Sequence, residues 1–316
     1  MSDPGLLAAF TSGRVRAVEH MAARLAQGYD SWREDTVTDV LCQHTAPYVK
    51  SIQFNGFQEG RNGLDWLCWW RDRSGLCFGS LVQAKNLKRE VTGWAAGFDQ
   101  KNKQGLQLDL LLASARRFRL PALYMLYAGT PEYRTGLECK HHSEPVCLRC
   151  ERAGVSVVSA LTVQYRAGFL TRGELAVDSF QRATPWEDLA DPALPAGRLW
   201  TGALKDYVGP CSERLLRFLT EDQVGAAEIA KRIFSPVHGV RMAQFSTALV
   251  EQVDTADTMV FTDLPNDQGH LSEPHFLHVL QGLRTGLPQY VRDAELGRAV
   301  PVEVSQSLAG IIIVDI

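Results

Sequence analysis

The stretch that decides the fold reads Gly63-Leu64-Asp65-Trp66-Leu67-Cys68-Trp69-Trp70 and, after a polar turn, Leu76-Cys77-Phe78-Gly79-Ser80-Leu81-Val82-Gln83-Ala84-Lys85. Both runs are apolar and aromatic and are bounded by Gly, Ser, Asp and Arg, which predicts two strands joined as a hairpin. Side chains alternate between the faces of a strand, so Gln83 and Lys85 point one way and Ala84 points the other, toward a packed layer. Asp65 lies at the start of the first strand, where its carboxylate can reach the end of the neighbouring strand. An acid, an amide and an amine at one sheet edge suit a hard cation beside a phosphate.

This hairpin resembles the catalytic core of the PD-(D/E)XK nucleases, most closely the branch similar to Mrr-type restriction endonucleases. In that branch a Gly-x-Asp strand precedes a Val-Gln-x-Lys strand, as Gly63-Leu64-Asp65 and Val82-Gln83-Ala84-Lys85 do here. Several uncharacterised bacterial proteins share these strands and an acidic helix before them. The resemblance covers roughly residues 30 to 165, and it departs from the usual pattern at the neutral Gln83. A simpler interpretation, an aromatic hairpin whose Asp and Lys have no joint role, fits the same residues.

The resemblance implies a site for Mg²⁺ or Mn²⁺ and a phosphodiester. Asp65 and Glu34 would supply carboxylate ligands, and the Gln83 side chain and the Ala84 backbone carbonyl would supply neutral oxygens. Lys85 would orient or activate the attacking water. Because Gln83 carries no charge, we expect the site to hold one metal ion more readily than two.

Glu34 has two competing interpretations. Ser31-Trp32-Arg33-Glu34 has the spacing of a capping box, in which the glutamate would only satisfy a backbone N–H at the start of a helix. Helical geometry also places Glu34 at the rim of the apolar stripe of that helix, near the sheet. An acid at this point of the first core helix joins the metal site in the resembling family, and we expect that role here.

A cysteine-rich loop at residues 139–150 predicts a second metal site. Cys147-x-x-Cys150 is half of a structural zinc site, and Cys139 with His141 or His142 would complete a tetrahedral Cys₃His arrangement. Free thiols in an exposed loop, or a redox pair, explain the same residues. The other cysteines are expected to be core or incidental residues: Cys42, Cys68, Cys77 and Cys211.

Composition and charge narrow the class of protein. The chain has 316 residues, 45% hydrophobic and 22% charged, with a formal charge of −3, as in an ordinary globular protein. Between Gln83 and Arg119, however, the sequence contains eight basic residues and three acidic ones, which gives a net charge of +5. A basic rim suits a phosphodiester substrate, and a solvated helix face explains it nearly as well. The residues expected to bind nucleic acid are Lys88, Arg89, Lys101, Lys103, Arg116 and Arg117.

The remaining patterns set the expected architecture. The sequence has seven unevenly spaced cysteines, which do not suggest a secreted disulfide framework. It shows no apolar leader and no run near the ~20 apolar residues of a membrane span. We therefore expect a cytoplasmic protein with no membrane partner. We expect an α/β fold: a restriction-endonuclease-like core (helix, three strands, helix, strand) in residues 1–165, and a C-terminal α+β extension or second domain in residues 166–316. The expected elements include helices at 13–27 and 107–118 and strands at 48–54, 122–127, 155–163 and 310–316.

Three functions remain open at this point. The resemblance implies a metal-dependent DNA endonuclease in bacterial defence against foreign DNA, and it leaves room for a homo-oligomer or a partner from a defence system. The second is a non-cleaving module that holds nucleic acid or protein on a nuclease-like fold. The third is a nuclease that uses the same chemistry and cuts RNA. The presence of both Asp65 and Lys85 favours an active nuclease over a non-cleaving module, because a module that does not catalyse a reaction has no need of both residues.

Overall fold

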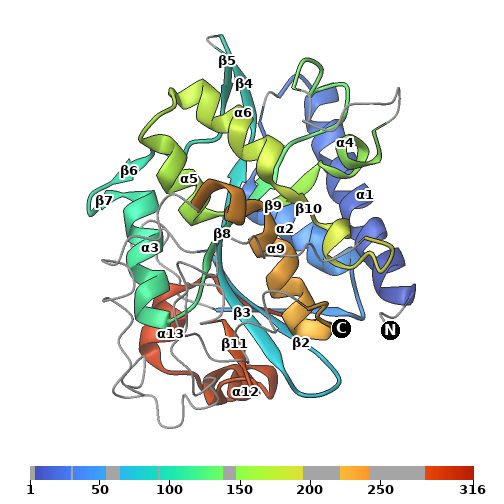
Figure 1. Cartoon of the computed structure of the whole chain (residues 1–316), viewed down its shortest axis with the longest axis vertical. Coiled ribbons are helices and arrows are strands. Elements are labelled where there is room, and N and C mark those ends of the chain that lie inside the picture. The colour runs from blue at the N-terminus through green and yellow to red at the C-terminus, as the bar shows by residue number, and fades with distance from the viewer. Residues whose placement is uncertain are drawn as a thin grey trace.

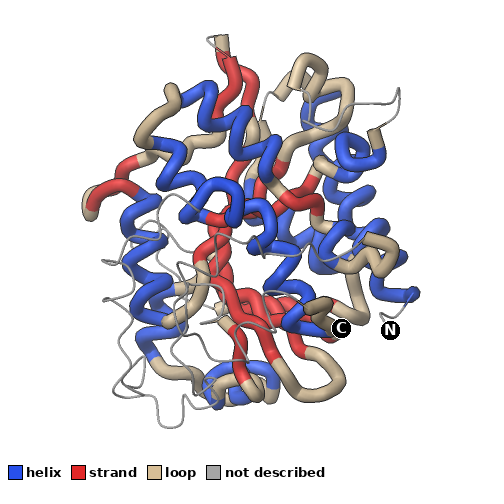
Figure 2. Tube along the Cα trace, viewed as in Figure 1, coloured by secondary structure: helices blue, strands red, loops and turns tan. Residues whose placement is uncertain are grey.

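Helices lie on both faces of one central sheet (Figures 1 and 2). The computed structural model describes residues 4–29, 31–54, 65–91, 93–137, 147–194, 221–241 and 282–316. Within these ranges the protein is α/β, as expected, with a mixed sheet of eight strands. The strands of that sheet are β1 (Val49–Gln53), β2 (Trp66–Arg71), β3 (Cys77–Asn86), β8 (Ala122–Tyr127), β9 (Val155–Ser159), β10 (Thr184–Pro185), β11 (Leu283–Arg284) and β12 (Gly310–Asp315).

The strands follow the order β1-β12-β2-β3-β8-β9-β10, and β11 also pairs with β3. Two pairings are parallel, β12 with β2 and β3 with β8, and the others are antiparallel. The expected hairpin is present as β2 and β3, with Trp66 opposite Val82. Every residue of β3 is buried, so this strand is the centre of the molecule.

Alternation along the strands divides the core into two layers. Trp66, Cys68 and Trp70 of β2 pack in one layer, and Leu67 and Trp69 pack in the other. The first layer is covered by α1 (Pro4–Ala26), α2 (Glu34–His44), η1 (Glu187–Leu189) and α9 (Gly225–Arg241). The second is covered by α3 (Gln107–Phe118), α5 (Ala160–Ala167), α6 (Arg172–Arg182), α12 (Gln289–Glu295) and α13 (Val302–Ser307).

Gly79 shows how closely the hairpin strands pack. A Cβ atom added at this position would lie 2.6 Å from the Trp69 ring, which crosses directly over the glycine. Trp69 is fully buried there. The glycine in the quoted stretch is therefore required by its cross-strand neighbour.

The C-terminal strand corrects the expected division of the chain. The strand predicted at 310–316 forms as β12, but it lies inside the sheet between β1 and β2. Residues 166–316 are therefore not a separate extension, because one of their strands completes the core sheet. Gly310–Val314 is buried on both faces, which is typical of a central strand with a parallel neighbour.

From residue 30 onward the order is α2, β1, β2, β3, then four short strands, β4 to β7, which were not expected, and then α3 and β8. One expected strand is wrong in part. The apolar run 155–163 is a strand only as far as Ser159, and α5 begins at Ala160. Short apolar runs do not distinguish a buried strand from a buried helix, and Leu161 and Val163 are buried on the helix instead.

Two small hairpins lie between β3 and α3. The first pairs β4 (Lys88–Glu90) with β5 (Gly93–Ala95), and the second pairs β6 (Lys101–Asn102) with β7 (Gly105–Leu106). Figure 1 shows that they project from the body of the protein in different directions. A short helix, α4 (Leu148–Arg152), precedes β9.

Candidate active site

The last residues of β3 form an open edge beside β2. The β2 strand begins at Trp66, opposite Val82, so β3 continues from Gln83 to Asn86 without β2 as a partner on that side. Among the described residues, two carboxylates contact β3 there in place of a strand. Asp65 Oδ2 accepts a hydrogen bond from the Ala84 N–H at 2.7 Å, and Glu34 Oε1 accepts one from the Asn86 N–H at 3.0 Å.

These contacts set the spacing of the two acids. Ala84 and Asn86 are two residues apart, so the N–H groups they present are about 6.8 Å apart along the strand. The C=O of a strand residue points to the same neighbour as its N–H, and the Ala84 carbonyl therefore faces this edge between the acids. Two carboxylates and a carbonyl oxygen thus line one edge, as the sequence predicts for Asp65, Glu34 and Ala84.

The capping-box interpretation of Glu34 is wrong. Helix α2 begins at Glu34 with Arg33 as its N-cap and has no side-chain cap, so Glu34 is the first helical residue and not the third. Its carboxylate is free to reach β3. The same segment docks a second time on the strand, because Asn86 Nδ2 donates to the Trp32 carbonyl at 2.6 Å.

Lys85 occupies the same end of the strand and is buried, with 4% of its surface exposed. Its Nζ donates to Gln100 Oε1 at 2.9 Å and to Gln107 Oε1 at 2.7 Å. An ammonium group has three N–H donors. Among the residues that the structure describes, the third donor of Lys85 has no protein acceptor.

The charges of this cluster act on one another. Burial raises the pKa of Glu34 above its ordinary value, and the charge of Lys85 and the hydrogen bond from Asn86 oppose that shift. Burial lowers the pKa of Lys85, and the charges of Glu34 and Asp65 oppose that shift. Desolvation thus disfavours both charged forms, and a cation near Glu34 would lower the pKa of its carboxyl group again.

Gln83 points to the Lys85 face and is 4% exposed. Within the described ranges its Oε1 has no hydrogen-bond partner, and neither has the hydroxyl of Tyr124, which is paired with Gln83 across β3 and β8. A buried polar atom without a partner costs about 1–3 kcal/mol and commonly marks the place of a water, an ion or a ligand.

The oxygen atoms of this site fit a hard cation. Asp65, Glu34, the Ala84 carbonyl and Gln83 provide carboxylate, carbonyl and amide oxygens, which suit Mg²⁺ or Mn²⁺ ions that keep several waters. No three His, Cys, Asp or Glu side chains of the described ranges converge as a metal cluster. A cation held here would therefore rely on two acids, neutral oxygens and a phosphate.

Gln100 and Gln107 are site residues that the sequence reasoning missed. They flank the β6–β7 hairpin, and the Gln107 N–H donates to the Gln100 carbonyl at 2.9 Å. The available signal is the position of Gln107 as the first residue of an amphipathic helix, α3, that starts beside the end of β3. No sequence pattern pointed to Gln100.

The six basic residues do not form a single patch. Lys88 and Arg89 lie on β4, and Lys101 and Lys103 lie on the β6–β7 hairpin, so both pairs flank Lys85. Arg116 and Arg117 lie at the opposite end of α3, about 14 Å along the helix axis from Gln107.

The cysteine loop is described only in part. Cys147 is the N-cap of α4 and Cys150 lies one turn later, and both are half-buried. Cys139, His141 and His142 lie outside the described residues, as do Gly63, Leu64 and Cys211, so the zinc site stays a prediction. The cysteines expected in the core, Cys42, Cys68 and Cys77, are buried free thiols.

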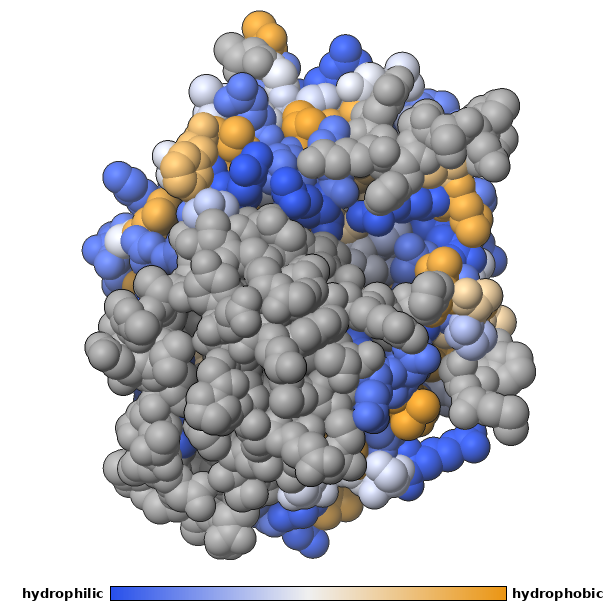
Figure 3. Space-filling view, in the orientation of Figure 1, coloured by the Kyte–Doolittle hydropathy of each residue, from blue (hydrophilic) through white to orange (hydrophobic). Residues whose placement is uncertain are grey.

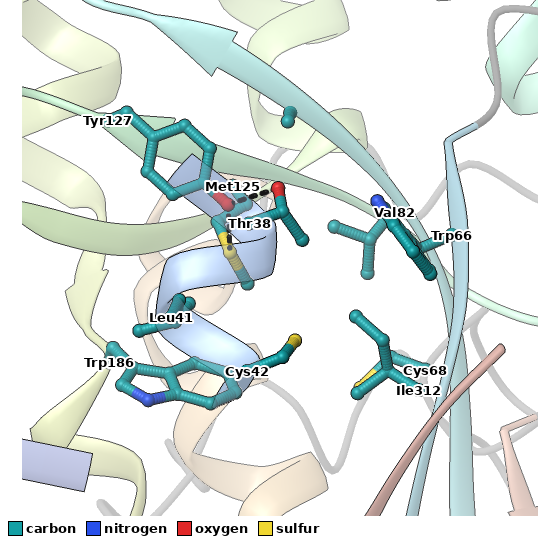
Figure 4. A pocket seen from close by; sticks show the side chains of 11 residues that line it. Thr38, Leu41, Cys42, Trp66, Cys68, Val82, Met125, Tyr127, Trp186 and Ile312 are labelled. Carbon is teal, nitrogen blue, oxygen red and sulfur yellow. Dashed lines mark hydrogen bonds between the residues drawn. The ribbon is translucent and has the colours of Figure 1, made fainter. Parts of the chain in front are cut away.

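A small cavity lies behind the site, between α2 and the opposite face of β3 (Figure 4). It has a volume of about 20 Å³, enough for roughly one water, and apolar side chains including Val82 and Ala84 form most of its wall. The Thr38 and Tyr127 hydroxyls on its rim bond to each other at 2.6 Å. The cavity is too small and too apolar for a substrate, so it is not part of the candidate site.

The comparisons with known proteins place the chain in a family. A family model described as a family of unknown function (DUF6615) matches residues 7–312, so the chain belongs to that family. No curated protein and no solved structure shows a significant match. No helix within the described ranges is both long enough and apolar enough to span a bilayer.

Proposed function

We propose that this protein is a metal-dependent phosphodiesterase with a PD-(D/E)XK-type site, and specifically a DNA endonuclease. One observation carries the proposal. Asp65 and Glu34, from two separate elements, lie side by side on consecutive outward N–H groups of β3, and Lys85 lies at the same strand end. Such a set of oxygens beside a buried amine suits the hydrolysis of a phosphate ester.

Asp65, Glu34, the Ala84 carbonyl and Gln83 would hold the ion. A bound Mg²⁺ or Mn²⁺ supplies Lewis acidity to a phosphoryl oxygen and lowers the pKa of water. The residues of this chain position the reactants. The third N–H of Lys85 orients the attacking water or binds a non-bridging phosphate oxygen, where it stabilises the developing negative charge. As the water oxygen bonds to phosphorus, the bond to the leaving oxygen breaks.

Gln100 and Gln107 act on this chemistry through Lys85. Their amide oxygens accept two of its three N–H groups, which fixes the direction of the third. Neutral amides hold the ammonium without adding negative charge, so Lys85 remains available to a phosphate. We assign both glutamines as positioning residues.

A non-cleaving nucleic-acid or protein module is the second candidate, and one observation favours it. Asp65 and Glu34 already accept hydrogen bonds from backbone N–H groups that β2 leaves unpaired. Capping a strand end is a sufficient structural role for a carboxylate. An RNA nuclease would use the same residues as a DNA nuclease, so only substrate tests separate these two.

One assay tests the proposal. Supercoiled plasmid, linear duplex DNA, single-stranded DNA and RNA are incubated with Mg²⁺, Mn²⁺ or EDTA. We expect metal-dependent cutting of DNA that is lost in Asp65→Asn and Lys85→Met. Asp35→Asn is the matched control, because Asp35 is an exposed acid next to Glu34 on α2 that pairs with Arg33. Absence of cutting with every substrate and metal would contradict the proposal, and cutting of RNA alone would reassign the substrate.

A role in defence against foreign DNA, in the bacterial cytoplasm, completes the proposal. The nuclease resemblance supports it, and the free thiols of Cys42, Cys68 and Cys77 fit a reducing compartment. A homo-oligomer or a partner from a defence system stays part of this proposal.

A further inference from the structure

Both small hairpins are attached directly to the candidate active site. The β4–β5 hairpin begins at Lys88, three residues after Lys85. The β6–β7 hairpin is flanked by Gln100 and Gln107, the two residues that hold the Lys85 amine. A substrate that touches either hairpin is therefore placed relative to Lys85.

The β4–β5 hairpin is fixed at its base and open at its tip. The Arg89 N–H donates to the Tyr133 hydroxyl at 2.9 Å, and the ring of Trp94, opposite Arg89 in the hairpin, lies 5.6 Å from the Tyr133 ring. At the far end Val91 is fully exposed. Figure 3 shows hydrophobic surface at the top of the molecule, where Figure 1 places the β4–β5 hairpin. The β5 strand packs along α6, so the β4 side of the hairpin and Val91 near its tip are the parts open to solvent.

The charges on the two hairpins are unbalanced. The acids of this region, Glu90 and Asp99, both pair with Arg172 of α6, at 3.1 and 3.5 Å. Within the described ranges, the basic residues on the hairpins form no ion pair of their own: Lys88, Arg89, Lys101 and Lys103. Neutralised acids beside unpaired bases leave a positive surface on both sides of the site, which suits a polyanion.

We propose that the two hairpins are the DNA-binding elements of the protein: β4–β5 enters the major groove of a duplex, and β6–β7 contacts phosphates on the other side of the site. This inference rests on the proposed nuclease function. The major groove of B-form DNA, about 12 Å wide, admits a two-stranded β-ribbon. The major groove of A-form RNA is too deep and narrow for side chains to read. The ribbon therefore favours duplex DNA over duplex RNA.

The residues on the ribbon suit contacts with base edges. Arg89 is exposed and can donate two hydrogen bonds to a guanine, and Val91 can contact a thymine methyl group. Val91 lies five residues beyond Asn86, about 17 Å along the chain. That distance is an upper limit on how far the hairpin tip reaches from the end of β3.

The test measures binding separately from cutting. Asp65→Asn protein, in EDTA and over a series of salt concentrations, is titrated with a labelled 30-base-pair DNA duplex, the matching RNA duplex and single-stranded DNA. On this background Arg89→Ala should lower the affinity for duplex DNA about tenfold and leave RNA binding unchanged. Lys101→Ala with Lys103→Ala should lower the slope of log affinity against log salt by about 1.8. Arg16→Ala, which removes an exposed arginine of α1 outside both hairpins, is the matched control and should bind DNA as its parent does.

The inference is overturned if Arg89→Ala binds duplex DNA as tightly as its parent, if it loses RNA affinity equally, or if Arg16→Ala loses as much affinity. Its failure differs from failure of the proposed function. If the wild-type protein and Arg89→Ala cut DNA equally and bind the duplex equally, the nuclease proposal stands and the hairpin assignment is wrong. If the protein cuts no substrate but binds duplex DNA through Arg89, the nuclease proposal is wrong and the hairpin assignment stands.

Discussion

Substitutions of Asp65 separate a role in catalysis from a role in holding the end of β3. Its Oδ2 atom accepts the Ala84 N–H at 2.7 Å, and Ala84 is buried, so water replaces this acceptor only in part. Asp65→Ala removes the acceptor, whereas Asp65→Asn keeps an oxygen in its place and removes only the charge. The two variants therefore separate the hydrogen bond from the carboxylate.

The magnitudes follow from that hydrogen bond. A hydrogen bond to a charged group contributes about 1.5–3 kcal/mol, and the partial exposure of Asp65 puts its contribution near 1.5 kcal/mol. Asp65→Ala should therefore lower the melting temperature by about 2–4 °C, and Asp65→Asn should lower it by less. Loss of a carboxylate ligand should reduce the cleavage rate at least about a hundredfold in both variants.

Thermal denaturation and plasmid cleavage are measured on the same preparations, with Asp35→Asn as the control. If Asp65 only caps the strand, Asp65→Asn keeps nearly normal activity and Asp65→Ala loses activity only in proportion to stability. A folded Asp65→Asn protein that cuts at the wild-type rate would refute the assignment of the carboxylate to the active site.

Three further predictions concern other parts of the chain. Arg152→Ala should cost about 3–5 kcal/mol in chemical denaturation, because it leaves Glu187, which is 1% exposed, without one of its two arginines. Arg16→Ala, which breaks an exposed pair, should cost less than about 0.5 kcal/mol, and equal losses would contradict the reasoning. Glu34→Gln should raise the Mg²⁺ concentration needed for cutting. Since burial raises the folded pKa of Glu34, wild-type stability should fall as pH rises from 4.5 through that raised pKa, and the variant should lack this fall. Purified protein should contain about one equivalent of zinc that Cys147→Ser reduces, and a wild-type content well under half an equivalent would leave ordinary thiols.

Features set by local pattern were predictable from the sequence. The β2–β3 hairpin, α3 and β8 follow from apolar runs and turn residues a few positions apart. The facing of Lys85 and Ala84 follows from simple alternation along β3. The meeting of Asp65 with the end of β3 follows from the antiparallel register of the hairpin.

Features that depend on distant segments were not predictable. The pairing of β12 with β1 and β2 joins residues far apart in sequence. The apolar run 310–316 does not predict which strands it will pair with. The contacts of Gln100 and Gln107 with Lys85 depend on the path of a short hairpin. The start of α2 was displaced by only two residues, and that displacement changes Glu34 from a helix cap into a site residue.

The position of β12 has a consequence for the timing of synthesis. The Ala309 N–H donates to the Asp65 carbonyl at 2.8 Å, so the segment that carries this acid is held by the segment leading into β12. A ribosome that adds 5–20 residues per second needs about 10–50 s to travel from the end of β2 to β12. During that interval β1 and β2 lack the strand that joins them, and the candidate active site lacks one of its supports. A growing chain would therefore leave the exit tunnel with the β12 side of its aromatic hairpin unpaired until residues 309–315 have emerged.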